Sequence, residues 1–270
     1  MLSAESRACE PVTLEPDPGN AGVGILKVAK FIRQQEKFLL AFFVANFLKG
    51  RVFMSTTLTR TEKTKRLTLS GVLIALGTVL SLLIVFKWPW GGSITVCSML
   101  PLAVLGYTYG VKWGLLCGFV YGVLQALLGA TMSQAFAGMN AGSTVAILCL
   151  DYLLAFSVIG LAGMFKGKIK SHTVALVLGT VVAVLARYLV HTVSGYIFYA
   201  SYADWFFGEA FVNSFSAAIV EICPPKMLGL VYSIIYNGCY MIPEVFITAI
   251  PAAILFTAVP PIRREMIKSR

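Results

Sequence analysis

Residues Val174–Phe198 read VALVLGTVVAVLARYLVHTVSGYIF, and this stretch decides the class of the fold. Arg187 and His191 are its only basic side chains, and it has no acidic one. An apolar run of about 18 residues or more is long enough to cross a bilayer as a helix. The whole chain of 270 residues is similar, with 58% apolar and 13% charged residues and a mean hydropathy of +0.81. Since soluble domains carry roughly a quarter charged residues, the composition excludes a soluble enzyme and predicts an all-α integral membrane protein.

Six apolar segments are long enough to be considered as membrane-spanning helices, and their lengths differ. They are Leu67–Phe86, Ser93–Tyr109, Trp113–Leu128, Val145–Phe165, Val174–Phe198 and Met227–Ala258. At about 1.5 Å per residue, the last is too long for one straight crossing. We therefore expect it to bend at Pro243 and Pro251, which cannot donate a backbone hydrogen bond.

The loops between these segments explain the formal net charge of +10. With six crossings, basic residues gather on one side: Arg60, Lys63, Lys65, Arg66, Lys112, Lys166, Lys168, Lys170, Arg263, Arg264, Lys268 and Arg270. The other side holds only Lys87 and Lys226 as basic residues, together with Asp204, Glu209 and Glu221. An excess of Lys and Arg marks cytoplasmic loops. The sequence therefore predicts six transmembrane helices with both termini cytoplasmic, a multi-pass protein of the cell membrane, and no need for a nucleic-acid partner.

Residues 1–62 differ from the rest of the chain and are expected to form an N-terminal extension to a membrane domain over 63–270. A proline-containing acidic stretch gives way to Ile25–Arg51, whose apolar residues have helical spacing and suit a helix lying in the membrane interface. The alternative is that translation starts naturally at Met54. The first twenty residues lack the pattern of a secretory signal.

The six cysteines form no CxxC pair, so we expect free thiols rather than disulfides or a zinc site.

Ionisable groups inside membrane spans are costly and often mark a functional site. Here they are Asp151, Arg187, His191 and Glu244. At 1.5 Å per residue, Asp151 lies about 9 Å and His191 about 10 Å below the outer ends of their segments. Asn237 enters the last segment at a similar depth. Three polar side chains from three helices at one level predict a ligand pocket in the outer half of the bundle.

Aromatic residues accompany this polar level. His191, Gly195 and Tyr199 recur every four residues and share one helix face, while Tyr152 and Tyr232 come from the neighbouring segments. A carboxylate among aromatic rings suits an organic cation with a planar ring.

Each of these residues also has a simpler interpretation. Asp151 can be a structural partner of Arg187 or His191, and Tyr199 can belong to the aromatic belt at the membrane interface. Glu244 lies deeper and is expected to be structural. Arg187 is expected to hold helices together or to relay ligand occupancy.

Catalytic and nucleotide-binding motifs are missing from the sequence. It has no GxxxxGK[ST], HExxH or GxSxG pattern. We therefore expect no enzymatic activity, no cofactor and no nucleotide motor within this chain.

Four stretches carry a family resemblance, and they occur in a fixed order. They are GGSITVCSMLP (Gly91–Pro101), LDYLLAFSVIGLAG (Leu150–Gly163), RYLVHTVSGYIFYASYA (Arg187–Ala203) and YSIIYNGCYMIPE (Tyr232–Glu244). In these residues the chain resembles the thiamine-specific substrate-binding (S) component of energy-coupling factor (ECF) transporters, a bacterial vitamin-uptake family. The resemblance implies a six-helix S component that binds thiamine with high affinity from outside. It further implies partnership with a transmembrane coupling subunit and two ATPase subunits.

The resemblance also implies roles for individual residues. Asp151 stands where the family has an acidic ligand-binding residue, and Tyr199 where a ring stacks on the ligand. The other implied pocket residues are Tyr152, His191, Tyr232 and Asn237, with Trp90 and Gly92 in an outer loop that acts as a gate. Gly71 and Ala75 form a small-residue face that would pack against the coupling subunit, and simple packing within the bundle is the alternative.

One stretch departs from the family pattern, and two other functions stay open. Residues Asp204–Lys226 form a longer stretch than expected and predict an additional helix on the outer surface.

The first alternative function is an S component for another vitamin or a thiamine precursor. The second is a proton-coupled secondary transporter acting alone through Asp151, His191 and Glu244. A membrane enzyme is disfavoured by the missing motifs.

Overall fold

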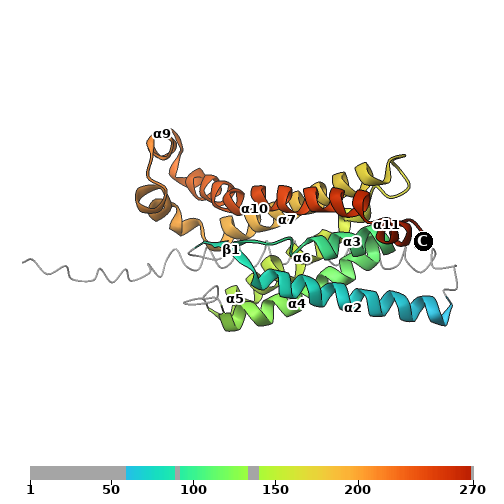
Figure 1. Cartoon of the computed structure of the whole chain (residues 1–270). Coiled ribbons are helices and arrows are strands. Elements are labelled where there is room, and N and C mark those ends of the chain that lie inside the picture. Colours follow the sequence, from blue (N-terminus) through green and yellow to red (C-terminus); the bar gives the residue numbers. More distant parts are fainter. Residues whose placement is uncertain (1–58, 89–91, 133–139, 269–270) are drawn as a thin grey trace, which may run out of the picture. The chain divides into compact units, whose positions relative to one another are not determined.

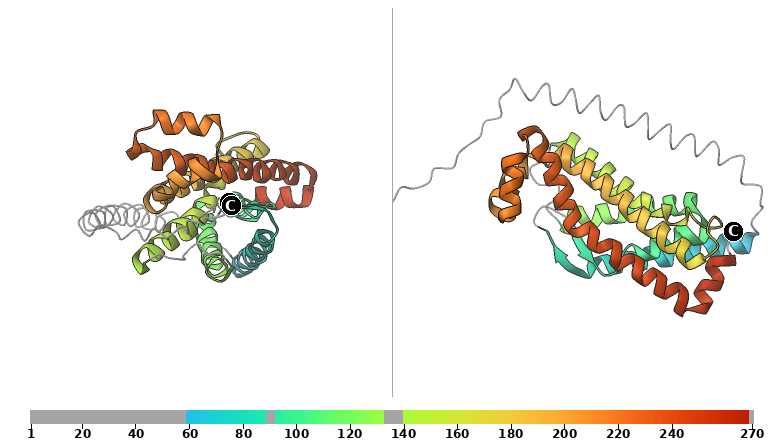
Figure 2. Two further views of the ribbon diagram at one scale, coloured as in Figure 1. Left: turned by 90° about the vertical axis from the view of Figure 1, so that its left-hand side faces the viewer. Right: turned by 90° about the horizontal axis from the view of Figure 1, so that it is seen from above.

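The computed structural model describes residues 59–88, 92–132 and 140–268. The 1–58 stretch, with the predicted interfacial segment and Met54, lies outside the described residues. The described unit is a helical bundle, in which α7 (His172–Phe198) and α10 (Pro225–Ala258) lie side by side (Figures 1 and 2). Within the described residues, five helices are long and apolar enough to cross a membrane: Arg60–Leu82, Val111–Gly129, Ala141–Gly163, His172–Phe198 and Met227–Ala258.

The first predicted span ends early. Helix α2 covers Arg60–Leu82, and a capping box between Thr59 and Glu62 fixes its start. The chain then forms strand β1 (Ile84–Lys87) instead of continuing as helix to Phe86. The expectation that these residues are helical is wrong because a second strand, β2 (Ser93–Thr95), pairs with them antiparallel. A short apolar run rich in branched side chains does not distinguish helix from strand until its partner is known.

The second predicted span is also wrong in its secondary structure. Ser93–Thr95 is the strand β2, and only Leu100–Tyr109 is helical, as the ten-residue helix α3. Between them Cys97 has a positive φ of 56°, a conformation that side-chain-bearing residues rarely adopt and that a regular helix excludes. Strand, turn and short helix together carry the chain along the bundle from the hairpin end to the end where α2 begins (Figure 1).

The remaining predicted spans are helical, with shifted ends. Helix α4 covers Val111–Met132, and the fourth span runs from Ala141 to Gly163 through α5 (Ala141–Ile147), a π-helical segment (Leu148–Leu154), α6 (Ala155–Ser157) and a 3₁₀ segment (Val158–Gly163). Helices α5 and α7 begin where Asn140 and Ser171 accept hydrogen bonds from backbone amides. Helix α10 continues through both Pro243 and Pro251.

Glycines allow three segments to pack with their backbones in contact. A Cβ added at Gly160 would lie 2.2 Å from the backbone nitrogen of Leu115 in α4. One added at Gly163 would lie 2.0 Å from the carbonyl oxygen of Gly106 in α3. Small residues at helix contacts are how membrane proteins bring helices close without a hydrophobic driving force. The fourth span is therefore held directly against α3 and α4.

The stretch after α7 is helical and largely exposed, as the sequence predicts for Asp204–Lys226. Short helical turns (Ala200–Tyr202, α8 at Ala203–Trp205 and Phe206–Ala210) lead to α9, which covers Ser214–Ile222. Asn213 caps α9 by accepting hydrogen bonds from the amides of Phe215 and Ser216. The side chains of Phe215, Val220 and Ile222 are exposed.

The first and last described helices meet at the end of the bundle opposite the hairpin (Figure 1). Lys65 in α2 pairs with Glu265 in α11 (Pro260–Lys268) at 2.8 Å. Nearby, the Lys166 ammonium donates to the carbonyl oxygens of Thr108 and Met266, both at 2.8 Å. Lys166 thus joins the ends of α3 and α11, where unpaired helix carbonyls need donors.

Burial lowers the pKa of the Lys166 amine from its usual 10.5 to about 8. Between these pH values the unfolded chain binds more protons than the folded protein, so the free energy of unfolding rises with pH. We expect the melting temperature of the wild type to rise, relative to that of Lys166→Met, between pH 7.5 and 9.5. Thermal unfolding in detergent at the two pH values measures this. Parallel behaviour of the two proteins would show that Lys166 is not the group responsible.

Candidate ligand-binding site

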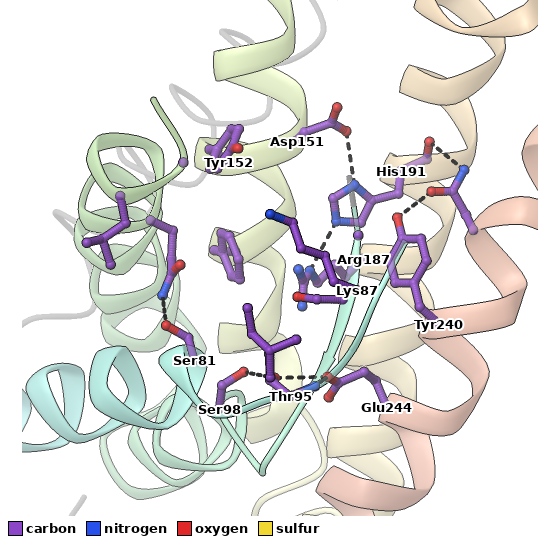
Figure 3. Close-up of a pocket in the computed structure, with 18 of the residues that line it drawn as sticks. Ser81, Lys87, Thr95, Ser98, Asp151, Tyr152, Arg187, His191, Tyr240 and Glu244 are labelled. Carbon is purple, nitrogen blue, oxygen red and sulfur yellow. Dashed lines mark hydrogen bonds and ion pairs between the residues drawn. The ribbon is translucent and has the colours of Figure 1, made fainter. Parts of the chain in front are cut away.

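A cavity of about 410 Å³ opens at the hairpin end of the bundle. Its walls come from the β1–β2 hairpin and from α2, α4, the fourth span, α7 and α10 (Figure 3). Among its lining residues are seven of those that the sequence analysis selected: Gly92, Asp151, Tyr152, His191, Tyr199, Tyr232 and Asn237. The eighth, Trp90, lies outside the described residues. The volume is within the range of small-molecule pockets, about 300–1,000 Å³.

Asp151 reaches this cavity from the π-helical segment Leu148–Leu154. A π turn contains an extra residue compared with an α turn, and such turns occur frequently at functional sites. The Asp151 carboxylate accepts a hydrogen bond from His191 Nδ1 at 3.0 Å and another from Ser194 Oγ at 2.8 Å (Figure 3 shows the former). Both donors are on α7. The carboxylate is therefore held in place while 17% of its side-chain surface stays exposed.

The contacts of His191 define its protonation state. Arg187 Nε lies 3.2 Å from His191 Nε2, and because a guanidinium can only donate, Nε2 must accept. The proton of a neutral imidazole is then on Nδ1, which donates to Asp151. A neutral His191 leaves the negative charge of Asp151 uncompensated within this pair.

Arg187 makes contacts to two other elements. Its Nη1 donates to Met99 Sδ at 2.9 Å, and its guanidinium lies 4.2 Å from the ring centroid of Phe156. Arg187 also lines the cavity. These contacts agree with the expectation that it holds helices together.

Tyr152 fits into a gap left by glycines of α4. A Cβ added at Gly129 would lie 2.4 Å from the Tyr152 hydroxyl oxygen, and one at Gly122 would lie 2.7 Å from its carbonyl oxygen. The ring of Tyr152 thus borders the cavity across from Asp151 and His191 (Figure 3). Tyr199, at the end of α7, borders the cavity as well.

Asn237 is buried, and its amide is occupied by protein groups. Its Nδ2 donates to the carbonyl oxygens of Ser233 at 2.8 Å and of His191 at 3.3 Å. Its Oδ1 accepts from the Tyr240 hydroxyl. Asn237 therefore ties α10 to α7 at the height of His191 and orients Tyr240.

Sequence reasoning missed Lys87 and several aromatic residues that line the cavity, Tyr236 and Tyr240 among them. Tyr236 and Tyr240 continue from Tyr232 at four-residue intervals, so all three share one face of α10. That spacing is visible in the sequence and could have identified them. Lys87 on strand β1 also lines the cavity, and only the hairpin, which the sequence analysis took for helix, brings it there.

Glu244 is deeply buried and nevertheless lines the cavity. Its Oε1 accepts from the backbone nitrogen of Thr95 at 2.6 Å and from Thr95 Oγ1 at 2.9 Å. These bonds agree with the expected structural role. They also place a second carboxylate at the cavity, so that acidic Asp151 and Glu244 and basic Lys87 and Arg187 all line it.

Gly71 and Ala75 do not line this cavity and are exposed on α2. A Cβ added at Gly71 would meet no described atom within 4 Å. The described part of the bundle thus gives no packing reason for a glycine at this position.

Comparisons with known proteins identify the family. Residues 67–216 match the family described as "Thiamine transporter protein (Thia_YuaJ)". The chain is 30% identical to the thiamine transporter ThiT of Bacillus subtilis over 181 residues, covering 64% of this chain and 79% of the relative. It is 26% identical to ThiT of Lacticaseibacillus paracasei over 176 residues, covering 60% and 73% respectively.

A solved structure of ThiT from Listeria monocytogenes has the same fold. Its TM-score is 0.54 at 22% identity, and the match covers 74% of this chain and 97% of that one. Together with its apolar helices, these matches make the chain a multi-pass bacterial membrane protein of a transporter family rather than an enzyme. With more than half of its length matched, the chain belongs to the thiamine transporter protein family (Thia_YuaJ).

Proposed function

We propose that this protein is the thiamine-binding S component of an ECF transporter and that the cavity beside Asp151 holds the vitamin. The observation that carries the proposal is the pairing of Asp151 with a neutral His191 in a cavity lined by aromatic rings. The chain that forms this cavity belongs to a thiamine transporter family. The thiazolium ring of thiamine carries a permanent positive charge. The Asp151 carboxylate attracts that charge, and the tyrosine rings offer stacking and cation–π contacts.

We propose six crossings with both termini in the cytoplasm. The Lys65–Glu265 pair supports an even number of crossings, because it joins the first and last described helices at one end of the bundle. Strand β2 and α3 together supply the crossing that no single long helix makes. The excess of Lys and Arg at the α2–α11 end supports a cytoplasmic location for that end. The cavity would then open in the outer half of the membrane, and α9 would lie on the outer surface.

Direct identification of the bound molecule tests the ligand. We expect protein purified in mild detergent to retain thiamine, which mass spectrometry detects, and the emptied protein to bind added thiamine in a fluorescence titration. Recovery of another vitamin or a thiamine precursor would support the alternative S component. Uptake of thiamine by the purified chain alone in vesicles, driven by a pH gradient, would support the proton-coupled transporter.

The exposed face with Gly71 and Ala75 is the surface that we assign to the coupling subunit. Small residues allow a partner helix to approach closely, and the chain has no nucleotide-binding motif of its own. We expect Gly71→Leu and Ala75→Leu to bind thiamine normally but to lose most ATP-dependent uptake in vesicles containing the coupling and ATPase subunits.

A bulky substitution on a different face of α2 provides the control. Leu76 is exposed and lies roughly 140° around the helix from Gly71 at 100° per residue. Leu76→Phe should keep both binding and uptake. Full uptake by Gly71→Leu and Ala75→Leu would remove this face from the proposal, whereas loss of binding would point to a role inside the protein.

A further inference from the structure

Trp88 and the residues from Gly92 to Cys97 follow one face of α10. Its contacts fall on successive turns of that helix: Trp88 with Tyr236, Gly92 with Tyr240, Thr95 with Glu244 and Cys97 with Ile247. Their spacing of four, four and three residues is that of a single helix face. The hairpin side of the cavity is therefore attached to α10 along three turns.

The contacts change character along this face. At Trp88 and Gly92 the contacts involve aromatic rings of α10. The ring centroids of Trp88 and Tyr236 are 5.7 Å apart, and Gly92 packs against the ring of Tyr240. Such contacts are non-directional and can slide. The Thr95–Glu244 contact is instead a pair of directional hydrogen bonds to one carboxylate oxygen, at 2.6 and 2.9 Å. Hydrogen bonds to a carboxylate are stronger than those between neutral groups.

Burial adds to the importance of this contact. Glu244 is 2% exposed and Thr95 is 7% exposed. A buried donor that loses its acceptor costs more than the bond itself contributes, because water cannot replace the acceptor. The hydroxyl of Thr95 is also 2.7 Å from Ser98 Oγ, so the contact extends to the residue before Met99, the N-cap of α3.

Strand β1 has few other attachments. All four of its residues are exposed, including Phe86 at 50% and Val85 at 66%. Yet Ile84 and Lys87 of this strand, with Gly92, Ser93 and Thr95, form one wall of the cavity. The position of that wall therefore depends on how firmly β2 is attached to α10.

We propose that Glu244 is a positioning residue: by binding Thr95 it anchors the hairpin on α10 and holds this wall of the cavity over a bound ligand. The inference rests on the proposed thiamine-binding function. When the anchor is lost, the wall moves away more readily, so a bound ligand leaves faster. Entry of the ligand does not require the closed wall, so the association rate changes little.

Stopped-flow fluorescence with thiamine measures the two rate constants separately. We expect Glu244→Ala to raise the dissociation rate constant about tenfold, as the loss of a charge-assisted hydrogen bond implies. The association rate constant should stay within about twofold of the wild type, a small change by the usual spread among variants of one site. Glu244→Gln keeps an acceptor oxygen and should restore most of the wild-type dissociation rate. Glu221→Ala removes an exposed carboxylate that does not line the cavity, so this matched control should leave both rate constants unchanged.

The Thr95 hydroxyl provides a second pair of variants should Glu244→Ala not fold. Thr95→Val removes the hydroxyl but keeps the backbone bond, so it should raise the dissociation rate less than Glu244→Ala would. Thr95→Ser should return it to the wild-type value. An unchanged dissociation rate in Glu244→Ala, or in Thr95→Val, would overturn the anchoring role. A lower association rate with unchanged dissociation would overturn it too.

Hydrogen exchange without ligand separates the two proposals. Peptides covering residues 84–88 and 92–98 should exchange faster in Glu244→Ala than in the wild type, with α7 unaffected. If the wild type binds no thiamine, the proposed function fails. The exchange experiment then tests by itself whether Glu244 anchors the hairpin on α10. Equal hairpin exchange in both proteins, or acceleration spread over α7, would overturn the anchoring even if thiamine binds.

Discussion

Asp151→Asn should lower the affinity for thiamine by about a hundredfold or more, corresponding to about 2.7 kcal/mol. The substitution keeps the size of the side chain but removes the negative charge that the neutral His191 leaves uncompensated. It also places an amide donor opposite either His191 Nδ1–H or the Ser194 hydroxyl, which both donate to Asp151. Fluorescence or calorimetric titration with thiamine measures the loss.

A neutral substitution of a carboxylate elsewhere controls for changes in overall charge. Glu221 is exposed on α9 and does not line the cavity. Glu221→Gln should bind thiamine as the wild type does. The melting temperature of Asp151→Asn should remain high enough for binding to be measured on folded protein. Equal affinity of Asp151→Asn and the wild type would exclude Asp151 from the binding site.

Gly160→Ala should strongly destabilise the bundle core. The added Cβ would lie 2.2 Å from Leu115 N and 2.3 Å from Gly114 C, both backbone atoms of α4 that cannot move aside alone. Separating the fourth span from α4 is the only relief, and overpacking of this kind costs about 3 kcal/mol. A large fall in melting temperature in detergent is the expected result.

Gly208→Ala is the matched control, because a Cβ at Gly208 would meet no atom of the described residues within 4 Å and Gly208 has no positive φ. Its melting temperature should stay close to that of the wild type. If Gly160→Ala also melted like the wild type, the close approach of the fourth span to α4 would not contribute to stability in solution.

The long apolar helices were predictable from the sequence because a run of more than twenty apolar residues has few other stable arrangements in a bilayer. The shared depth of Asp151, His191 and Asn237 followed from helix rise alone, and all three residues line the cavity. For these residues the local pattern and the tertiary structure agree.

The hairpin was not predictable by the same reasoning. Ile84–Phe86 and Ser93–Thr95 are apolar enough to be read as helix, and their pairing depends on contacts between strands and with α10. The π-helical segment is likewise invisible to a count of apolar residues. Lys87 was missed because the hairpin that brings it to the cavity was not predicted. Tyr236 and Tyr240 were overlooked although their spacing from Tyr232 is regular.

The wide turn that carries Asp151 gives the fourth span a tolerance for a change in length that a regular helix lacks. Deleting one residue between Leu148 and Leu154 would allow the chain to return to ordinary α-helical hydrogen bonding at little cost. Because the wide turn holds one residue more than an α turn, its two flanks would keep their faces, and Gly160 would stay against α4. The carboxylate lies within the turn itself, so the same deletion would shift Asp151 relative to His191 and Ser194. A homologue shorter by one residue here would thus keep its helix packing while the side chains it presents to the cavity change.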